Sequence, residues 1–373
     1  MNILVINLDK AIFEKDSSSL RRLKEYSRLV DKIFVIVWTR KKGESISFED
    51  KLFIYPTNSK FKILYFIQSF FLACRIAKKD KIDLIFTQDP FETGLAGWIV
   101  SKIKKVPLQI QVHTDFLSSF FEQESFFNKI RVILANFLIP RAHSLRVVSE
   151  RIKKSIITNY KLPITKIFVL PIFVDLKKIQ DMPVNTDLRK KYPQFGFIIL
   201  MASRFSKEKN IYLAIDAIKE VNKKYPKASL IIVGNGPEED KLRSQVMSHK
   251  LQDNIKFESW TDNIISYYKT ADLFLLTSNY EGYGMSVIEA MAAGCPVVMT
   301  DVGCAGEVVK DRHNGIVIPV GDKEKLIDSI IKLIEDGERR KRLGKYASES
   351  VYNYKDKNEY LENYKKSWEA ARL

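Results

Sequence analysis

The stretch that decides the fold runs from Leu273 to Pro296 and reads LFLLTSNYEGYGMSVIEAMAAGCP. Its first four residues, Leu273 to Leu276, are apolar and predict a short buried strand. A loop with two glycines follows, and the apolar residues beyond it recur at helical spacing, which predicts a helix from Ser286 to Ala293. A strand, a glycine loop and a helix N-terminus in this order are typical of a parallel α/β sheet, and such a helix end can hold a phosphate.

Apolar runs alternate with segments of helical periodicity on both sides of this stretch, and the runs are nearly continuous, as expected of parallel strands covered on both faces. The predicted strands of the first half are Ile3–Ile6, Ile33–Trp38, Leu84–Thr87, Leu108–Val112, Leu145–Val148 and Ile167–Leu170. Those of the second half are Phe197–Ala202, Leu230–Val233, Ile255–Phe257, Leu273–Leu276 and Pro296–Met299, with helices near 208–224, 237–249, 284–293 and 322–335.

The segment between the two halves holds turn formers, among them Pro171, Pro183 and Pro193, and little periodicity, which predicts a hinge. The sequence therefore predicts an α/β protein of two doubly wound, Rossmann-like domains. In such sheets ligands bind at the carboxyl ends of the strands, so we expect the active site in a cleft between two facing sheets.

Composition and charge further restrict the classes of function that this chain can have. The chain has 373 residues, 46% of them apolar and 28% charged, which is the balance of a folded, enzyme-sized protein. Its formal net charge is +16, and residues 1–180 hold 31 basic and 17 acidic residues, so the excess belongs to the first half. This asymmetry indicates an anionic membrane surface, a phosphorylated acceptor or nucleic acid as partner; a merely solvated lysine-rich surface is the alternative.

Location signals are few. The three cysteines, Cys74, Cys295 and Cys304, are too scattered for a disulfide framework, which favours a reducing compartment. The amino terminus lacks the pattern of a signal peptide, and the apolar stretch Ile63–Cys74 is too short to span a bilayer. We therefore expect a cytoplasmic protein without a transmembrane helix.

Two acidic residues stand beside the predicted phosphate site. Glu281 lies in the glycine loop and Glu289 lies eight residues later in the helix. Carboxylates repel phosphate, so next to a bound diphosphate they are better explained as acceptors for hydroxyl groups of sugars attached at its two ends, as in a nucleotide sugar. The alternative is a capping role for Glu281 and a surface position for Glu289.

A basic cluster follows the strand Phe197–Ala202, at the edge where a ligand is expected. Arg204 and Lys209 could both neutralise a diphosphate there, including the charge that builds on it as a glycosidic bond breaks. A solvated helix start is the alternative.

Together these motifs resemble the family-4 glycosyltransferases, retaining enzymes of the GT-B fold, over nearly the whole chain. The resemblance rests on the Glu281-x7-Glu289 signature and the upstream Arg204 and Lys209, with support from Gly234-Asn235-Gly236-Pro237. It implies that Arg204 and Lys209 bind the donor diphosphate, Glu289 the ribose and Glu281 a hydroxyl of the donor sugar. The backbone amides of Gly284, Met285 and Ser286 would complete the cradle.

The first half contributes three further candidates. The resemblance places His113, at the end of the strand Leu108–Val112, facing the donor sugar across the cleft. Asp89 and Asp115 also lie at carboxyl ends of strands and are candidates for acceptor binding, with turn capping as the alternative. The loop after the first strand, Asn7 to Lys10, lacks the glycines common in the family, and Gly303-Cys304-Ala305-Gly306-Glu307 departs from the usual pattern as well.

The resemblance also implies the reaction: transfer of a hexose from a UDP- or GDP-sugar to a lipid-linked or saccharide acceptor in surface-glycan assembly, with retention at the anomeric carbon. No cofactor is expected, and the absence of an Asp-x-Asp triplet and of metal-ligand spacing among the four histidines predicts metal independence. Residues 1–175, completed by a C-terminal helix over 355–373, would form the acceptor-binding domain. Residues 176–354 would form the donor-binding domain.

Two basic, aromatic segments, Phe61–Lys79 and Phe116–Pro140, predict a peripheral membrane face in the first domain, at the inner side of the cell membrane. Packing of their aromatic faces into the core is the alternative. Two other functions stay open: a non-catalytic basic module with the same architecture, and a nucleotide-sugar epimerase that needs no acceptor. No nucleic-acid-binding motif is found.

Overall fold

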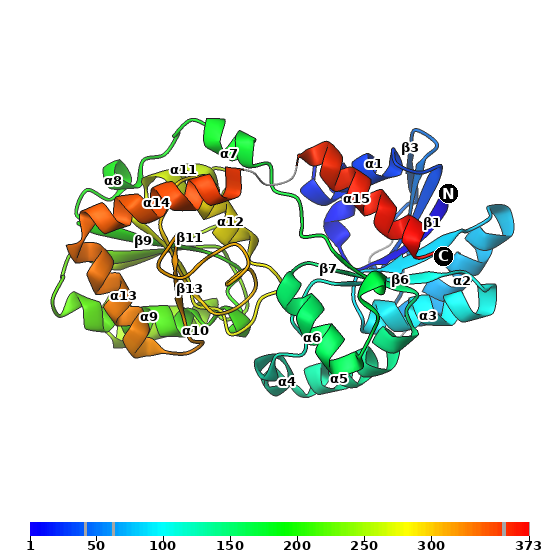
Figure 1. The fold of residues 1–373 in the computed structure, drawn as a ribbon, viewed down its shortest axis with the longest axis horizontal. Helices are drawn as coiled ribbons and strands as arrows, with labels where there is room; N and C mark the ends of the chain where they lie inside the picture. Colours follow the sequence, from blue (N-terminus) through cyan, green and yellow to red (C-terminus); the bar gives the residue numbers. More distant parts are fainter. Residues whose placement is uncertain (41–42, 62–63, 353–355, 373) are drawn as a thin grey trace. The chain divides into compact units, whose positions relative to one another are not determined.

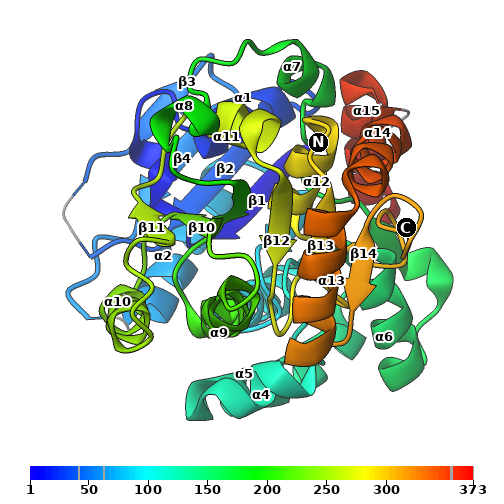
Figure 2. The same ribbon diagram turned by 90° about the vertical axis from the view of Figure 1, so that its left-hand side faces the viewer.

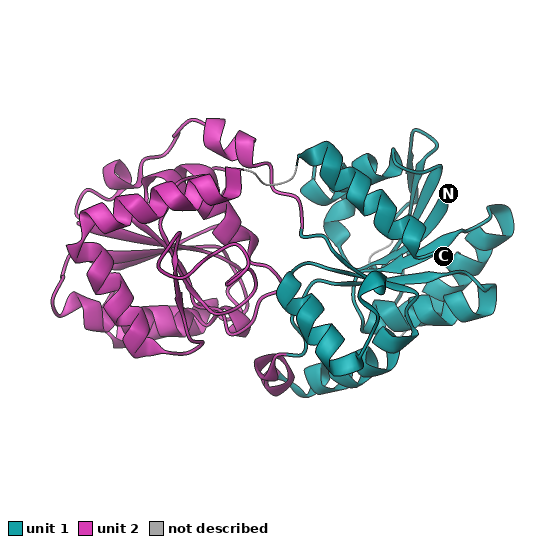
Figure 3. Cartoon of the chain, viewed as in Figure 1, with its two compact units in different colours: residues 1–117, 125–171, 356–373 teal, residues 118–124, 172–355 magenta. Residues whose placement is uncertain are grey.

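The structure is a computed structural model that describes residues 1–40, 43–61, 64–352 and 356–372. The chain forms two compact units, coloured separately in Figure 3. Unit 1 consists of Met1–Leu117, Ser125–Pro171 and Asp356–Leu373, and unit 2 consists of Ser118–Glu124 and Ile172–Lys355. The division thus falls after Pro171, a few residues before the boundary taken from the sequence, and the grouping of Ser118–Glu124 with unit 2 has no counterpart in the sequence analysis.

Within the described residues, unit 1 is built on an eight-stranded sheet of order β3-β4-β2-β1-β5-β6-β7-β8. Its strands are β1 (Asn2–Asn7), β2 (Lys32–Val37), β3 (Ile46–Phe48), β4 (Leu52–Pro56), β5 (Leu84–Thr87), β6 (Leu108–Val112), β7 (Ser144–Val147) and β8 (Ile167–Val169). All neighbours are parallel except β3 and β4. The predictions missed both strands of this pair: β3 is only three residues long and partly exposed, and β4 alternates buried with partly exposed residues instead of being continuously buried.

The helices of unit 1 are α1 (Ser18–Ser27), α2 (Leu64–Lys79), α3 (Glu92–Lys104), α5 (Phe126–Leu138), α6 (Glu150–Tyr160) and α15 (Lys357–Ala370). In Figure 1, α2, α3, α5 and α6 cover one face of the sheet, and α1 and α15 cover the other. Helix α15 is anchored by Trp368, which is fully buried and stacks on Phe86 of β5 at 5.9 Å. The predicted C-terminal helix is therefore confirmed over 357–370, and residues 353–355 and 373 lie outside the described residues.

Unit 2 contains a parallel sheet that shows six strands in the described part of the chain, in the order β11-β10-β9-β12-β13-β14. The strands are β9 (Phe197–Ala202), β10 (Ala228–Val233), β11 (Ile255–Glu258), β12 (Leu273–Leu276), β13 (Val297–Thr300) and β14 (Ile316–Ile318), of which the last was not predicted. Figure 2 shows β12, β13 and β14 side by side. Continuous apolar sequences thus became parallel strands, as their burial on both faces requires.

Helices cover both faces of this second sheet. The helices of unit 2 are α4 (Ser119–Glu124), α7 (Leu176–Asp181), α8 (Leu188–Lys191), α9 (Ile211–Asn222), α10 (Glu239–Ser248), α11 (Ile264–Thr270), α12 (Met285–Ala292), α13 (Lys323–Glu335) and α14 (Gly337–Tyr352), of which α4 packs beside the loop 207–209. In Figure 1, α9, α10 and α13 lie on one face, and α11, α12 and α14 lie on the other. The two doubly wound domains predicted from the sequence are confirmed.

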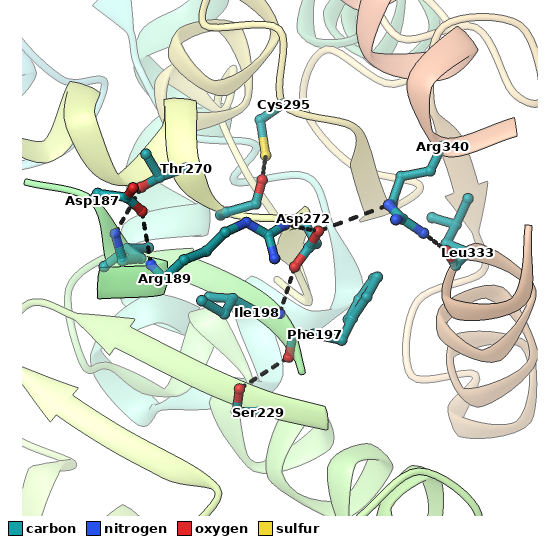
Figure 4. Close-up of polar contacts among 12 residues, drawn as sticks. Asp187, Arg189, Phe197, Ile198, Ser229, Thr270, Asp272, Cys295, Leu333 and Arg340 are labelled. Atoms are coloured by element: carbon teal, nitrogen blue, oxygen red, sulfur yellow. Dashed lines mark hydrogen bonds and ion pairs between the residues drawn. The ribbon is translucent and has the colours of Figure 1, made fainter. Parts of the chain in front are cut away.

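A closed ion-pair network lies at the amino end of β12 (Figure 4). Asp272 is buried there, with its side chain only 5% exposed. Its Oδ2 accepts the N–H of Ile198 at 2.9 Å, and its Oδ1 pairs with Arg189 and lies 3.9 Å from Nε of Arg340. Arg340 also donates to the carbonyl of Leu333 at 2.5 Å. These contacts join β9, β12, α8 and α14 at the edge of the sheet remote from the predicted ligand site.

Candidate functional site

The sheet of unit 2 has one topological switch point, between the adjacent strands β9 and β12. From β9 the chain continues to β10 and β11 on one side, and from β12 it continues to β13 and β14 on the other. Loops that leave such a pair of strands at their carboxyl ends diverge and create the usual ligand site of an open α/β sheet. The two loops here are residues 203–210 and 277–284, which hold four of the predicted site residues: Arg204, Lys209, Glu281 and Gly284.

Hydrogen bonds join the two loops. The hydroxyl of Thr277 lies 2.9 Å from the carbonyl oxygens of both Lys209 and Asn210. The N–H of Asn279 donates to the carbonyl of Glu208 at 2.7 Å, and the side-chain amides of Asn210 and Asn279 meet at 3.0 Å. The basic loop is therefore held at a fixed spacing from the acidic loop.

This spacing brings together two of the predicted residues. The Nζ of Lys209 lies 2.5 Å from Oε1 of Glu281, and the hydroxyl of Ser278 donates to the same oxygen at 2.8 Å. The side chains of Lys209 and Glu281 are 20% and 11% exposed, so the pair is largely shielded from water. Among the described residues, Oε2 of Glu281 accepts no hydrogen bond, which leaves one carboxylate oxygen available to a ligand hydroxyl.

Arg204 follows β9 in a loop whose shape depends on two glycines. A Cβ at Gly234 would lie 2.0 Å from the carbonyl oxygen of Ser203, and one at Gly236 would lie 2.3 Å from that of Phe205. Phe205 is fully buried, whereas Arg204 beside it is exposed and forms no ion pair within the described ranges. Its charge is therefore available to an anionic ligand.

The N-terminus of α12 completes this edge. Gly284 adopts φ +94°, a backbone conformation that favours glycine, and its carbonyl accepts the N–H groups of Val287 and Ile288. The preceding N–H groups, of Met285 and Ser286, are among the first of the helix, which have no partner inside a helix. The helix dipole and these N–H groups suit a phosphate.

Glu289 lies in the second turn of α12 and is held by a buried tyrosine. The hydroxyl of Tyr268, which is 1% exposed, donates to Oε2 of Glu289 at 3.1 Å. Burial raises the pKa of Glu289, and this hydrogen bond opposes that effect only in part. A partly buried carboxylate with a raised pKa and no cationic partner among its described contacts is a feature of functional sites rather than of structural ion pairs.

Next to Glu281, Tyr280 contacts the segment Ser118–Glu124, which is grouped with unit 2. Its hydroxyl donates to Glu124 of α4 at 2.7 Å, and its ring packs edge-on against Phe121 at 5.5 Å. The aromatic side of α4 is thus used in packing beside the acidic loop.

In unit 1, His113 follows β6 and is partly buried. Its Nε2 lies 3.0 Å from Oε1 of Gln111. Burial, reinforced by the positive charges of Arg146 and Arg22, lowers the pKa of His113 to about 3. The imidazole is therefore neutral at physiological pH and can exchange hydrogen bonds with a substrate without carrying charge.

The two aspartates of unit 1 lie in turns. Asp89 accepts the N–H groups of Phe91 and Thr93 at 2.8 and 3.2 Å and the hydroxyl of Thr93 at 2.8 Å, so it caps the start of α3. Asp115 accepts the backbone N–H of Leu117, and burial raises its pKa, as it does that of Asp89. These contacts favour the capping alternative, most strongly for Asp89.

Three residues that hydrogen-bond to predicted site residues were not predicted from the sequence. Ser278 holds Glu281, Tyr268 holds Glu289, and Gln111 holds His113. Ser278 and Gln111 could have been found, because each precedes its charged or polar neighbour by two or three positions at the end of a strand. Tyr268 lies 21 residues before Glu289, and its role depends on the packing of α11 against α12.

The loop 303–307, which departs from the usual family pattern, supports the acidic loop. A Cβ at Gly303, with φ +55°, would lie 2.4 Å from the carbonyl oxygen of Tyr283, and the N–H of Cys304 donates to that carbonyl at 2.8 Å. The loop 303–307 therefore keeps its backbone close to that of the acidic loop, although its sequence departs from the usual family pattern.

Comparison with known proteins identifies two family models on this chain. The model described as "Glycosyltransferase Family 4" matches residues 25–178, and the one described as "Glycosyl transferases group 1" matches residues 186–350. Together the two matches span most of both units.

Among curated proteins, the chain is 35% identical over 173 residues to a poly(glycerol-phosphate) alpha-glucosyltransferase of Bacillus subtilis, covering 46% of this chain and 26% of that protein. It is 26% identical over 280 residues to an alpha-monoglucosyldiacylglycerol synthase of Streptococcus pneumoniae, covering 72% and 60%. The chain thus spans less than two thirds of the length of either relative.

Among solved structures, Anabaena HepE in complex with UDP and glucose superposes with a TM-score of 0.78 at 22% identity, over 99% of this chain and 100% of that one. At this identity the likeness shows that the two chains share a fold.

Proposed function

The chain belongs to the family-4 glycosyltransferases, and on that premise we propose that it transfers a hexose from a nucleoside diphosphate sugar to a lipid-linked or saccharide acceptor. The observation that carries the proposal is the switch point of unit 2, where Arg204, the Lys209–Glu281 pair and the N-terminus of α12 gather at one sheet edge. Arg204 has no ion pair within the part of the chain that the structure describes. UDP is the first nucleotide to test, because the solved structure of HepE holds UDP with glucose.

The geometry supports different roles for the cationic groups and the carboxylates of this site. Arg204, Lys209 and the first N–H groups of α12 would bind the diphosphate and stabilise the negative charge that it gains as the glycosidic bond breaks. Glu289 would accept hydroxyl groups of the ribose, and Oε2 of Glu281 would accept a hydroxyl of the sugar. Both carboxylates would thus orient the donor.

We further propose that the reaction retains the anomeric configuration and needs no metal ion. The acceptor hydroxyl would attack the face of the sugar from which the diphosphate departs, through an oxocarbenium-like state, and its proton would leave with the diphosphate. No covalent nucleophile is assigned, because Glu281 is already paired with Lys209. NMR of the product's anomeric proton tests retention, and unchanged turnover in EDTA tests metal independence.

We also propose that the protein binds an anionic membrane, where a lipid-linked acceptor would lie. Helix α5 carries an exposed apolar stripe on one side: Phe126, Ile130, Ile133 and Phe137, with Phe127 beside it. Helix α2, on the same face of the sheet, exposes Ile67 and Phe71 next to Arg75. Other aromatic residues of the predicted segments, such as Phe116 and Phe121, are buried, so the alternative of core packing holds for them.

This layer of helices supports interfacial binding at the cytoplasmic side of the membrane, where basic residues and aromatic side chains favour anionic lipid. Residues 62 and 63, which belong to the first predicted segment, lie outside the described residues. In the described ranges, no helix has the length and apolar character needed to cross a bilayer.

Donor specificity can be tested by incubating the protein with UDP-glucose, UDP-galactose and GDP-mannose, with and without a lipid or oligosaccharide acceptor. Acceptor-dependent release of one nucleoside diphosphate is expected. A changed sugar nucleotide formed without acceptor would favour the epimerase, and an absence of nucleotide binding would favour the non-catalytic membrane module.

Membrane binding can be tested by sedimentation with phosphatidylglycerol-containing vesicles. Phe126→Glu with Phe127→Glu should release the protein, because both side chains are 73% exposed and their replacement adds negative charge. Met247→Glu, at a residue of unit 2 that is 64% exposed, is the matched control and should sediment like the wild type. Equal sedimentation of all three proteins would contradict the proposed face.

A further inference from the structure

Two neighbouring strands of unit 1 carry polar side chains on the face that α15 covers. Gln109 and Gln111 of β6 are paired in register with Ser144 and Arg146 of β7, and all four are buried. Buried parallel strands usually consist of apolar residues, and a buried charge is costly. This polar group therefore needs an explanation beyond packing.

Arg146 determines how the amide of Gln111 is oriented. Its side chain is 2% exposed, its Nη1 donates to Oε1 of Gln111 at 3.0 Å, and its Nη2 donates to the carbonyl of Leu170 at 2.6 Å. Because a guanidinium can only donate, the atom of Gln111 that faces it has to be the oxygen. The amide nitrogen then points to α15, where it donates to the hydroxyl of Tyr364 at 2.8 Å.

The oriented amide determines the tautomer of His113. The same Oε1 of Gln111 lies 3.0 Å from Nε2 of His113. A carbonyl oxygen can only accept, so Nε2 has to carry the proton. Since the ring is neutral, Nδ1 is unprotonated, and it makes no hydrogen bond among the described residues. This nitrogen is therefore a free acceptor for a hydroxyl group.

We infer that Gln111 is a positioning residue that holds His113 as its Nε2–H tautomer, with Arg146 and Tyr364 fixing Gln111 in turn, so that Nδ1 accepts a hydroxyl of the substrate. This inference rests on the proposed function, since the hydroxyl that Nδ1 would accept belongs to a sugar substrate. It gives the buried arginine and the C-terminal helix a role in the reaction. The ring of Tyr364, 4.7 Å from the guanidinium and stacked on Tyr26 at 4.4 Å, shields the charge of Arg146 on the helix side.

The tautomer can be read directly by two-bond ¹H–¹⁵N NMR of the histidine rings, with His113→Asn used to assign the signals. We expect a neutral Nε2–H ring in the wild type. Gln111→Leu should give mixed tautomers, and kcat for donor turnover should fall about tenfold to a hundredfold because the ring loses its orientation. Gln111→Glu keeps an acceptor oxygen and should retain the Nε2–H tautomer.

Gln109→Leu is the matched control. Gln109 lies on the same strand and face, donates to the carbonyl of Ser367 at 2.8 Å, and has no contact with His113. It should lower stability like Gln111→Leu but leave the tautomer and kcat unchanged. Tyr364→Phe, a milder change, keeps the inference testable if Gln111→Leu does not fold, and should lower kcat with unchanged UDP affinity.

An Nδ1–H tautomer in the wild type, or a tautomer and kcat unaffected by Gln111→Leu, would overturn the inference. Failure of the proposed function looks different: the wild type would then neither bind UDP nor turn over a donor, while the NMR spectrum would still decide whether Gln111 sets the tautomer.

Discussion

The two edges of the sheet in unit 2 both hold carboxylates and cations, but they use them differently. At the amino edge, both oxygens of Asp272 are occupied, by the N–H of Ile198 and by Arg189 and Arg340 (Figure 4). At the carboxyl edge, Glu281 shares one oxygen with Lys209 and Ser278 and leaves the other free among the described residues.

The same contrast holds for the remaining charged groups. Arg340 is engaged by Asp272 and by the carbonyl of Leu333, whereas Arg204 has no ionic partner in the described structure. Glu289 is partly buried, and among the described residues its carboxylate accepts a hydrogen bond from the hydroxyl of Tyr268 and has no cationic partner. Polar groups that are hydrogen-bonded to one another stabilise the fold. Donors and acceptors without a protein partner at a sheet edge lower stability, and they remain available to bind a ligand. Substitutions at the two edges should therefore separate activity from stability.

The largest effect is expected for Lys209→Ala. Donor turnover, measured as release of nucleoside diphosphate, should fall on the order of 10²- to 10³-fold, because a cation that stabilises the departing diphosphate is lost. Lys207→Ala, at an exposed lysine two residues earlier, is the control and should change turnover less than about twofold. Similar losses in both variants would show that only the general positive charge of the loop matters.

The next effect is expected at the opposite edge. Asp272→Ala should lower the free energy of unfolding by about 2–4 kcal/mol, because two guanidinium groups and a buried N–H lose their acceptor. Arg189 is 54% exposed and can be hydrated again, which keeps the loss in the lower part of that range. Urea denaturation measures the loss. The affinity of the folded protein for UDP should be unchanged, and a large drop in affinity would break the proposed separation of the two edges.

The smallest effect is expected at Glu289, where the free energy of unfolding should depend on pH. Burial raises the pKa of Glu289, so the folded state disfavours its carboxylate, and stability falls as the pH rises through and above its ordinary value of 4.5. Glu289→Gln should therefore raise the free energy of unfolding at pH 7 and change it little below about pH 4.

The same variant should bind UDP about tenfold more weakly, because a charged acceptor for the ribose is lost. Thermal unfolding across this pH range, with and without UDP, measures both effects. A destabilised Glu289→Gln protein with full UDP affinity would show that Glu289 is structural.

Much of this site could be predicted because it is local in sequence. The strand, loop and helix from Leu273 to Ala292 follow directly from apolar periodicity and glycine placement, and they bring Glu281 and Glu289 to one edge. Parallel strands place Arg204 and Lys209 at the same edge without any knowledge of packing, since all carboxyl ends point one way.

The rest depends on contacts between distant segments. Gln111 meets Arg146 through the pairing of β6 with β7, and Tyr364 meets Gln111 only because α15 packs against this sheet. Asp272 meets Arg340 only through the packing of α14. A buried arginine and a surface arginine look alike in a sequence. Strand β3 was missed because an edge strand of three residues carries too little periodicity.

The most direct test of the central claim is calorimetric titration of UDP into the wild type, Arg204→Ala and Lys207→Ala. We expect the wild type and Lys207→Ala to bind UDP with the same affinity and Arg204→Ala to bind it at least about tenfold more weakly. The unfolding temperature of Arg204→Ala without ligand should stay unchanged, since Arg204 forms no ion pair with any described residue. Equal UDP affinity in all three proteins, or no UDP binding by the wild type, would contradict the assignment of the carboxyl edge as the donor site.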